Sequence, residues 1–115
     1  MAVFEATPKK CNFNEITDIA FEAASVAEDG IQFKLPNSTD EYLVIVVQNT
    51  SGAEATITLK KPTNGSYAAA GSDEEHTLEA SGFAVIRLES ARFANTDGTV
   101  VLVPSDVAVK VAVLY

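Results

Sequence analysis

The sequence contains few of the residue types that form disulfides, metal sites and nucleophilic active sites. Among its 115 residues there is one cysteine, one histidine and no tryptophan. A lone cysteine cannot form an internal disulfide, so the cysteine content gives no sign of an oxidising compartment. Soft and borderline metal ions are bound by clustered Cys and His side chains, which this sequence lacks. We therefore expect no metal site and no cofactor.

The candidates for catalysis are correspondingly few. Nucleophilic catalysis needs a nucleophile, a base that activates it and a group that orients the base. Cys11 and His76 are the only residues of their types, and His76 follows the acidic run 73–75. We expect Cys11 to be a partly buried, small apolar residue and His76 to be a solvated side chain near carboxylates. No two of the 16 acidic residues stand out as a catalytic pair. The sequence therefore predicts a protein that is not an enzyme, and it nominates no catalytic, cofactor-binding or metal-binding residue.

Basic residues are also scarce. Eight Lys and Arg oppose 16 Asp and Glu, which gives a formal net charge of -8. A compact acidic domain repels phosphate backbones and anionic membrane surfaces. We therefore expect neither nucleic-acid binding nor membrane binding, and we interpret the acidity as a contribution to solubility.

Long apolar runs are missing. The longest uninterrupted one, residues 43–47, is far shorter than the roughly 20 residues of a membrane-spanning helix. Residues 1–5 lack the basic segment and the apolar segment of a signal peptide. We expect the protein to be made in the cytoplasm and not to be secreted through a signal peptide.

Short apolar runs, in contrast, recur along the chain. Hydrophobic residues make up 47% of the sequence, enough for one modest core at this length. The runs alternate with polar residues and are separated by turn residues, which is typical of strands. Strands are expected at residues 31–35, 42–48, 55–60, 75–79, 83–88, 99–103 and 107–114. We predict an all-β fold in a single domain, residues 1–115: a small antiparallel β-sandwich of about seven to eight strands, Ig-like or jelly-roll.

Some of these strands carry more specific expectations. Residues 42–48 are apolar on both faces, so we expect a central strand that is covered on both sides. The turn residues 49–52 and the alternating residues 55–60 then predict a hairpin over residues 42–60. The polar residues 75–79 predict an edge strand. In residues 107–114 the alternation places four side chains on one buried face: Val107, Val109, Val111 and Val113.

Two segments are ambiguous. Residues 13–27 fit a helical stripe through Ile16, Ile19, Ala20 and Ala24, and residues 19–26 fit a strand equally well. Residues 89–95 predict a corner or a single turn of helix.

Several surface features are candidates for contact with other molecules. Residues 62–73 predict an exposed loop, in which Tyr67 is either an interface anchor or a loop-packing residue. Residues 95–98 resemble a fragment of a calcium loop, but the Asp-Gly pair favours a turn between strands. Residues 1–14 contain Lys9 and Lys10, the most basic patch of the chain. They form either an N-terminal arm that orders on binding or a strand packed on its own domain.

Most of the chain from residue 27 onward resembles a group of small tailed-phage virion proteins. Four stretches carry the resemblance: residues 43–52 (LVIVVQNTSG), 55–59 (ATITL), 91–99 (ARFANTDGT) and 110–114 (KVAVL). Residues 27–33 (AEDGIQF) also look similar. The resemblance implies a β-sandwich that coats or stabilises a phage capsid, as decoration proteins do. It brings no catalytic residues with it.

The expected function is therefore that of a non-enzymatic phage or prophage virion structural protein. The resemblance favours a capsid decoration or head-stabilising protein that docks on the assembled capsid. Its partners would be the major capsid protein or other virion proteins, and it would form a homo-oligomer such as a trimer. It would be made in the bacterial host cytoplasm and end in the virion. The docking elements would be residues 1–14 or 62–72. The alternative is an Ig-like adhesion or ligand-binding module for a carbohydrate or a host protein.

Overall fold

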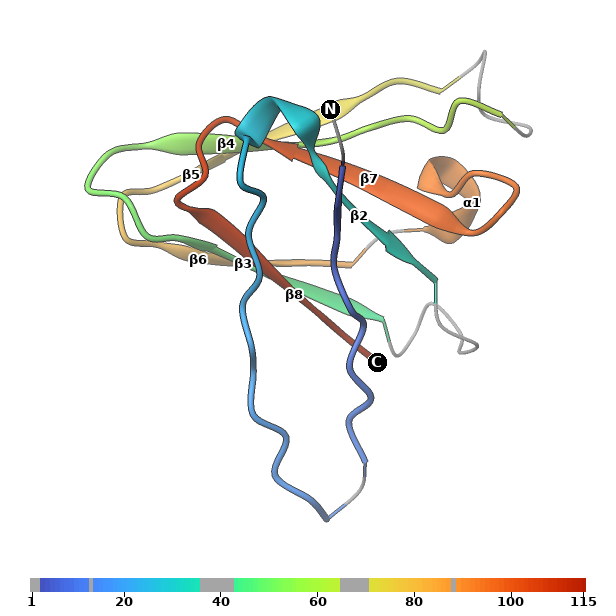
Figure 1. Cartoon of the computed structure of the whole chain (residues 1–115), viewed down its shortest axis with the longest axis horizontal. Coiled ribbons are helices and arrows are strands. Elements are labelled where there is room, and N and C mark those ends of the chain that lie inside the picture. Colours follow the sequence, from blue (N-terminus) through green and yellow to red (C-terminus); the bar gives the residue numbers. More distant parts are fainter. Residues whose placement is uncertain (1–2, 13, 36–42, 65–70, 88) are drawn as a thin grey trace.

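The computed structural model describes residues 3–12, 14–35, 43–64, 71–87 and 89–115, and within them the fold is all-β (Figure 1). Eight strands form a five-stranded sheet, in the order β1-β2-β7-β4-β5, and a three-stranded sheet, in the order β6-β3-β8. The strands are β1 (Phe4–Glu5), β2 (Ile31–Lys34), β3 (Val44–Asn49), β4 (Ala55–Leu59), β5 (Glu74–Leu78), β6 (Phe83–Ile86), β7 (Thr99–Pro104) and β8 (Val109–Leu114). A 3-10 turn η1 (Ala27–Asp29) and a one-turn helix α1 (Ser90–Phe93) complete the elements.

Several expectations from the sequence are confirmed. Each of the seven predicted strands has its counterpart, and the pairing is antiparallel except between β1 and β2. β5 is an edge strand, and α1 is the predicted single turn of helix. Among the described residues, no helix is long and apolar enough to cross a membrane.

One hydrophobic cluster takes buried side chains from both sheets. Each strand contributes every second residue, because successive side chains point to opposite faces. The five-stranded sheet contributes Ile31, Phe33, Ala55, Ile57, Leu59, Leu78, Val100 and Leu102. The three-stranded sheet contributes Ile45, Val47, Val109, Val111 and Val113. Most of these residues are β-branched or aromatic, which suits a pleated and half-buried surface.

The antiparallel pairs are nested along the chain. The innermost pair is β4 with β5, the next is β3 with β6, and the next is β2 with β7. An antiparallel bridge between Glu22 and Val111 lies outside all of them. The chain from Glu22 to Val111 is thus one long hairpin folded over on itself, and the pairs β4–β7 and β3–β8 close the two sheets.

The expected hairpin over residues 42–60 is wrong. β3 belongs to the three-stranded sheet and β4 to the five-stranded sheet, so the intervening turn carries the chain across the core. Asn49 is buried, and its side-chain amide donates to the carbonyls of Ala53 and Glu79. The Asn49 side-chain carbonyl oxygen accepts from the Ser51 backbone amide. These bonds make the turn an arch between layers rather than a reversal within one sheet.

Two predicted burials also need correction. β3 is central in its sheet, but Val44 and Val46 on its outer face are only partly buried, because no second layer covers that face fully. Val107 is 45% exposed and precedes β8. The Asp106 side chain accepts from the Ala108 amide and its backbone carbonyl accepts from the Val109 amide, so the turn includes Val107.

The N-terminal segment bonds to both sheets. β1 pairs with β2 at the edge of the larger sheet, and Lys9 and Cys11 exchange backbone hydrogen bonds with β8 and Tyr115. The described part of residues 1–14 agrees with the second of the two alternatives, a strand packed on its own domain. Between Cys11 and Glu22 the chain leaves the sheets as a loop that projects from the body (Figure 1, blue). No helix forms in the described part of residues 13–27, and the Glu22–Val111 bridge is closest to the strand alternative.

Asn49 provides a test of how the two layers are held. Replacing Asn49 with Ala removes three hydrogen bonds made by a buried side chain. We expect a loss of about 2–4 kcal/mol in the free energy of unfolding, measured by urea denaturation. The control Gln48→Ala, on the outer face of the same strand, should cost less than about 1 kcal/mol. An Asn49→Ala loss as small as the control's would contradict this role.

Candidate functional site

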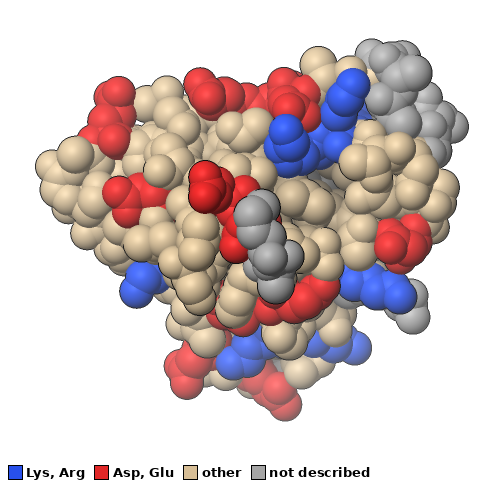
Figure 2. Space-filling model, turned by 45° about the horizontal axis from the view of Figure 1, so that its top comes forward, with Lys and Arg blue, Asp and Glu red and all other residues tan. Residues whose placement is uncertain are grey.

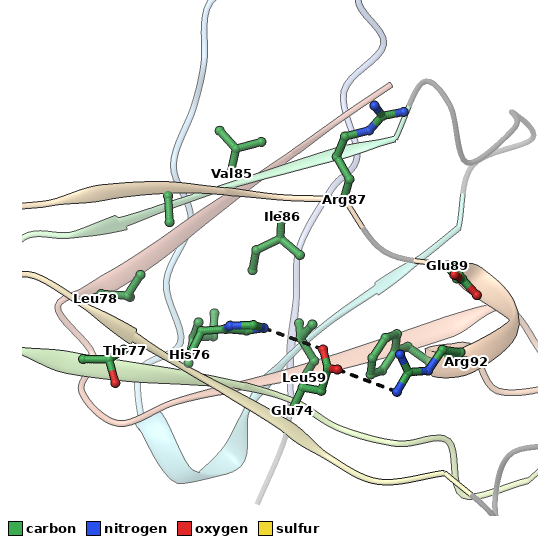
Figure 3. A pocket seen from close by; sticks show the side chains of 13 residues that line it. Leu59, Glu74, His76, Thr77, Leu78, Val85, Ile86, Arg87, Glu89 and Arg92 are labelled. Atoms are coloured by element: carbon green, nitrogen blue, oxygen red, sulfur yellow. Dashed lines mark ion pairs between the residues drawn. The ribbon is translucent and has the colours of Figure 1, made fainter.

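A cleft with a volume of about 440 Å³ lies between the edge strands β5 and β6 (Figure 3). Apolar side chains of β4, β6 and α1 form its floor, and charged side chains surround its mouth. The lining residues are Ile57, Leu59, Glu74, His76, Thr77, Leu78, Ala84, Val85, Ile86, Arg87, Glu89, Arg92 and Phe93. An apolar floor with a few polar groups at the mouth is the usual composition of a ligand site.

Strand register explains why charged residues reach this cleft. Glu74 lies opposite Leu59, and His76 lies opposite Ile57. Cross-strand partners share a face of the sheet, so Glu74 and His76 point toward the core side of β5. Only their position at the sheet edge keeps them in contact with water. Inward-pointing charges on an edge strand also disfavour pairing with another chain.

The charges at the mouth compensate one another. The Glu74 carboxylate lies 3.7 Å from His76 Nε2 and 3.7 Å from Arg92 Nη2 (Figure 3, dashed lines). The Arg92 guanidinium carbon is 5.2 Å from the centroid of the Phe93 ring. The three side chains are 39–51% exposed, so these contacts contribute little to stability. The group can orient a small polar ligand above an apolar floor.

The structure keeps the two candidate catalytic residues apart. Cys11 bonds through its backbone to Tyr115 beside β8, whereas His76 lies on β5. β8 and β6 are opposite edges of the smaller sheet, and β5 borders the cleft on the β6 side. The expectation that Cys11 is partly buried is wrong. Cys11 is exposed, because the N-terminal segment that runs beside β8 turns away from the sheet there to form the projecting loop. His76 is solvated and beside a carboxylate, as predicted.

The acidic run 73–75 does not converge on one point. Asp73 accepts hydrogen bonds from Lys60 Nζ and from the Lys61 backbone amide, both at 2.8 Å. The hydrogen bond from Lys60 is the main reason that the pKa of Asp73 is lowered. Glu75 lies opposite Thr58 and therefore on the face away from Glu74. Among the described residues, no three His, Cys, Asp or Glu side chains form a group that could hold a metal ion.

Residues 95–98 form the predicted turn. Gly98 has a φ of 87°, a conformation that glycine adopts readily. Asp97 Oδ1 accepts from the Thr99 hydroxyl at 2.7 Å and from the Thr99 amide at 3.1 Å. The hydroxyl bond is the first cause of the lowered pKa of Asp97. The oxygen that would serve a cation is therefore engaged in closing the turn.

The loop predicted over residues 62–73 is anchored at its start. Thr63 and Asn64 bond to Asn95 and Thr96, which ties the beginning of the loop to the turn before β7. Tyr67, the candidate anchor residue of this loop, lies outside the described residues.

Several large apolar side chains are exposed, which the sequence does not reveal. Ile16 is 97% exposed in the projecting loop, and Phe83 and Val85 on β6 are each 65% exposed. Phe21 contacts Phe83 with ring centroids 6.2 Å apart, so the segment beside β8 reaches across the outer face of the smaller sheet. The alternation of side chains in a strand predicts that β6 has two different faces. It does not show which of the two faces is covered.

Charged side chains do not form a single-sign patch on the face shown in Figure 2. Acidic groups are spread over it, with basic groups among them. This arrangement is consistent with the interpretation of the acidity as a contribution to solubility.

Comparison with known proteins identifies no relative: no protein-family model matches the chain, and neither a curated protein nor a solved structure matches it. The function must therefore be inferred from the residues and from the geometry of the fold.

Cys11 should behave as an ordinary surface thiol. Because it is exposed and lies away from His76, we expect it to react fully with a disulfide reagent such as Ellman's reagent without denaturant. His76→Ala should leave the rate unchanged. A rate that falls about tenfold in His76→Ala would show that the two residues interact after all.

Asp97 gives a prediction for acid. Because hydrogen bonds from Thr99 lower the pKa of Asp97 below its usual 3.8, ionised Asp97 stabilises the fold above the unfolded-state pKa. That contribution is lost as the pH falls through the folded-state pKa. Thr99→Ala should raise the pKa of Asp97 toward its usual value in an NMR carboxyl titration. The lowered pKa of Asp73, which depends on Lys60, should not change and is the internal control.

Proposed function

We propose that the two sheets form a β-sandwich of the jelly-roll type. A jelly roll is a long antiparallel hairpin wrapped so that its nested strand pairs are divided between two sheets. The nested pairs β4–β5, β3–β6 and β2–β7, with the Glu22–Val111 bridge outside them, support this assignment. The shared core of the two sheets supports the sandwich. Jelly rolls occur in viral capsid domains and in lectins, so the fold alone leaves the function open.

We propose further that the protein is a non-enzymatic virion structural protein of a phage or prophage. In this role it decorates or stabilises the assembled capsid, in contact with the major capsid protein or another virion protein. Three observations favour it: the sequence resembles small tailed-phage virion proteins, Cys11 and His76 lie far apart in the fold, and the described residues contain no metal-binding group. The protein would be made in the host cytoplasm and end in the virion.

The projecting loop is the observation on which this proposal depends most. Its Ile16 side chain is almost completely exposed and is therefore accessible to a partner. The loop is held by hydrogen bonds from Lys9 Nζ to the Asp18 carbonyl and from Asn12 to Glu15. A loop that is already held in place loses less entropy when it docks. An anchored loop that presents the exposed Ile16 side chain suits a protein that attaches to a preformed surface.

The second candidate is a ligand-binding module, and the cleft between β5 and β6 favours it. The cleft combines an apolar floor with the Glu74, His76 and Arg92 side chains at its mouth. A carbohydrate or a host-protein side chain would be held there by polar contacts at the mouth. Chemical-shift changes confined to the cleft residues, on addition of oligosaccharides to the isotope-labelled protein, would support this candidate over the first.

Co-sedimentation with capsid shells tests the docking proposal. The proposal predicts that capsid genes neighbour the gene of this protein. The wild-type chain should pellet, at micromolar concentration, with shells assembled from the products of those genes. Ile16→Glu should weaken the association by at least about tenfold, since a buried carboxylate replaces an apolar contact. Its thermal unfolding should not change, because Ile16 contributes nothing to the core.

The matched control is Val107→Glu, which places the same charge on an exposed valine outside the loop. It should pellet like the wild type. If the wild-type chain stays in the supernatant, the decoration role is wrong. If Ile16→Glu pellets normally, the loop is not the docking element.

A further inference from the structure

β6 is the least protected sheet edge in the described molecule. It pairs with β3 on one side, and no described residue pairs with its other side. Its four residues, Phe83–Ile86, include no charge and no proline. The other edges are protected: β5 carries inward-pointing Glu74 and His76, β8 is bonded to Lys9 and Glu22, and β1 is only two residues long and includes a charged residue. An apolar edge without such protection is a template for pairing with another chain.

The hydrogen-bond pattern shows which backbone groups face outward. The Asn49 amide donates to the Gly82 carbonyl, so the Gly82 carbonyl and, two residues on, the N–H and C=O groups of Ala84 face β3. Phe83 and Val85 alternate with them and direct their N–H and C=O groups away from β3. These are the same two residues whose side chains are 65% exposed. Unpaired backbone groups and uncovered side chains therefore coincide.

We propose that β6 pairs with β6 of a second copy of this chain, antiparallel and about a two-fold axis. In the register that uses the outward-facing groups, Phe83 of each copy lies opposite Val85 of the other. Each of these two pairs exchanges both of its backbone hydrogen bonds, and Ala84 lies opposite Ala84 on the axis. The two three-stranded sheets then become one continuous sheet of six strands.

The strand is complementary to itself, which is what a two-fold interface requires. The pairing places an aromatic side chain beside a β-branched one twice, a favourable cross-strand combination. It also brings no charge into the centre of the contact, although each copy carries a formal net charge of -8.

The size of the contact sets the expected affinity. Four residues on each side bury less than the roughly 800 Å² per partner of a standard stable interface. The dimer should therefore be weak and form reversibly with rising concentration. On a surface that holds many copies side by side, the local concentration would favour it.

Sedimentation velocity tests the proposal with the protein alone. The wild-type chain should shift reversibly from monomer to dimer between about 10 µM and about 1 mM. Val85→Lys places two lysines at the contact and should weaken dimerisation by at least about tenfold. The matched control Val107→Lys adds the same charge at an exposed valine away from β6 and should dimerise like the wild type. If Val85→Lys does not fold, Val85→Thr keeps the branched shape and should weaken the dimer several-fold.

An NMR experiment on mixed labelled and unlabelled protein tests the register. Residues opposite each other without mutual hydrogen bonds have Cα atoms about 4.5 Å apart, so the Ala84 Hα atoms of the two copies should show a strong intermolecular NOE. A chain that stays monomeric at about 1 mM overturns the proposal, and so does a dimer that lacks this NOE. If the wild type is monomeric but Val85→Lys loses binding to capsid shells, the β6 edge serves a strand of the shell protein instead. Shell binding by the wild type is a separate readout, so the dimer can fail while the decoration role stands.

Discussion

The buried side-chain amide of Asn49 links two of the turns in which the chain crosses between the sheets. Its side chain bonds to Ala53 in the β3–β4 turn and to Glu79 in the β5–β6 turn, and its backbone amide bonds to Gly82. A buried polar group is costly unless its hydrogen bonds are made. At Asn49 both the donor and the acceptor of the side-chain amide are engaged, so the same side chain stabilises both turns. This single side chain makes the nested arrangement of β3, β4, β5 and β6 one cooperative unit.

The cleft is a consequence of the same arrangement. β5 and β6 are consecutive in the chain, and Gly82 bonds back to Glu79 in the short turn that joins them. The two strands belong to different sheets, so they can close on each other only at this turn. At the other end of β5, Glu74 and Arg92 occupy the opening that the sheets leave. The position of the candidate ligand site is therefore determined by topology, whereas its charges come from the register of β5 on β4.

The local features of the fold could be predicted from the sequence, and the pairings could not. Alternation predicts β2, β4 and β8 because the side-chain period of a strand is visible in a single segment. The predicted hairpin of residues 42–60 is wrong because a turn such as 49–52 looks the same whether it reverses the chain within one sheet or crosses between two. The outcome depends on Glu79, which is 30 residues from its partner Asn49. Long-range partners of this kind leave no local signal.

The candidate site shows the same limit. The sequence correctly places His76 in a polar edge strand beside acids, since both properties depend on its neighbours in the chain. Its proximity to Arg92 depends on where α1 packs, which no segment reveals by itself. Phe83 and Val85 are recognisable as strand residues, but hydrophobicity alone predicts burial. Their exposure results from β6 being an edge strand whose outer face is only partly covered.

The nested pairing also determines when this protein can fold during synthesis. β2 cannot form its antiparallel pair until β7 has been synthesised. The segment around Glu22 cannot form its bridge until Val111 in β8 has been synthesised. Because a ribosome covers the most recently made residues, neither sheet can be completed until β7 and β8 have left it. Such non-local pairing requires long loops to close before the stabilising contacts can form, which makes folding slow. In the interval, the strands that will form the core are exposed to other chains. The arrangement that gives the finished molecule its two cooperative layers therefore leaves the nascent chain dependent on the strand that emerges last.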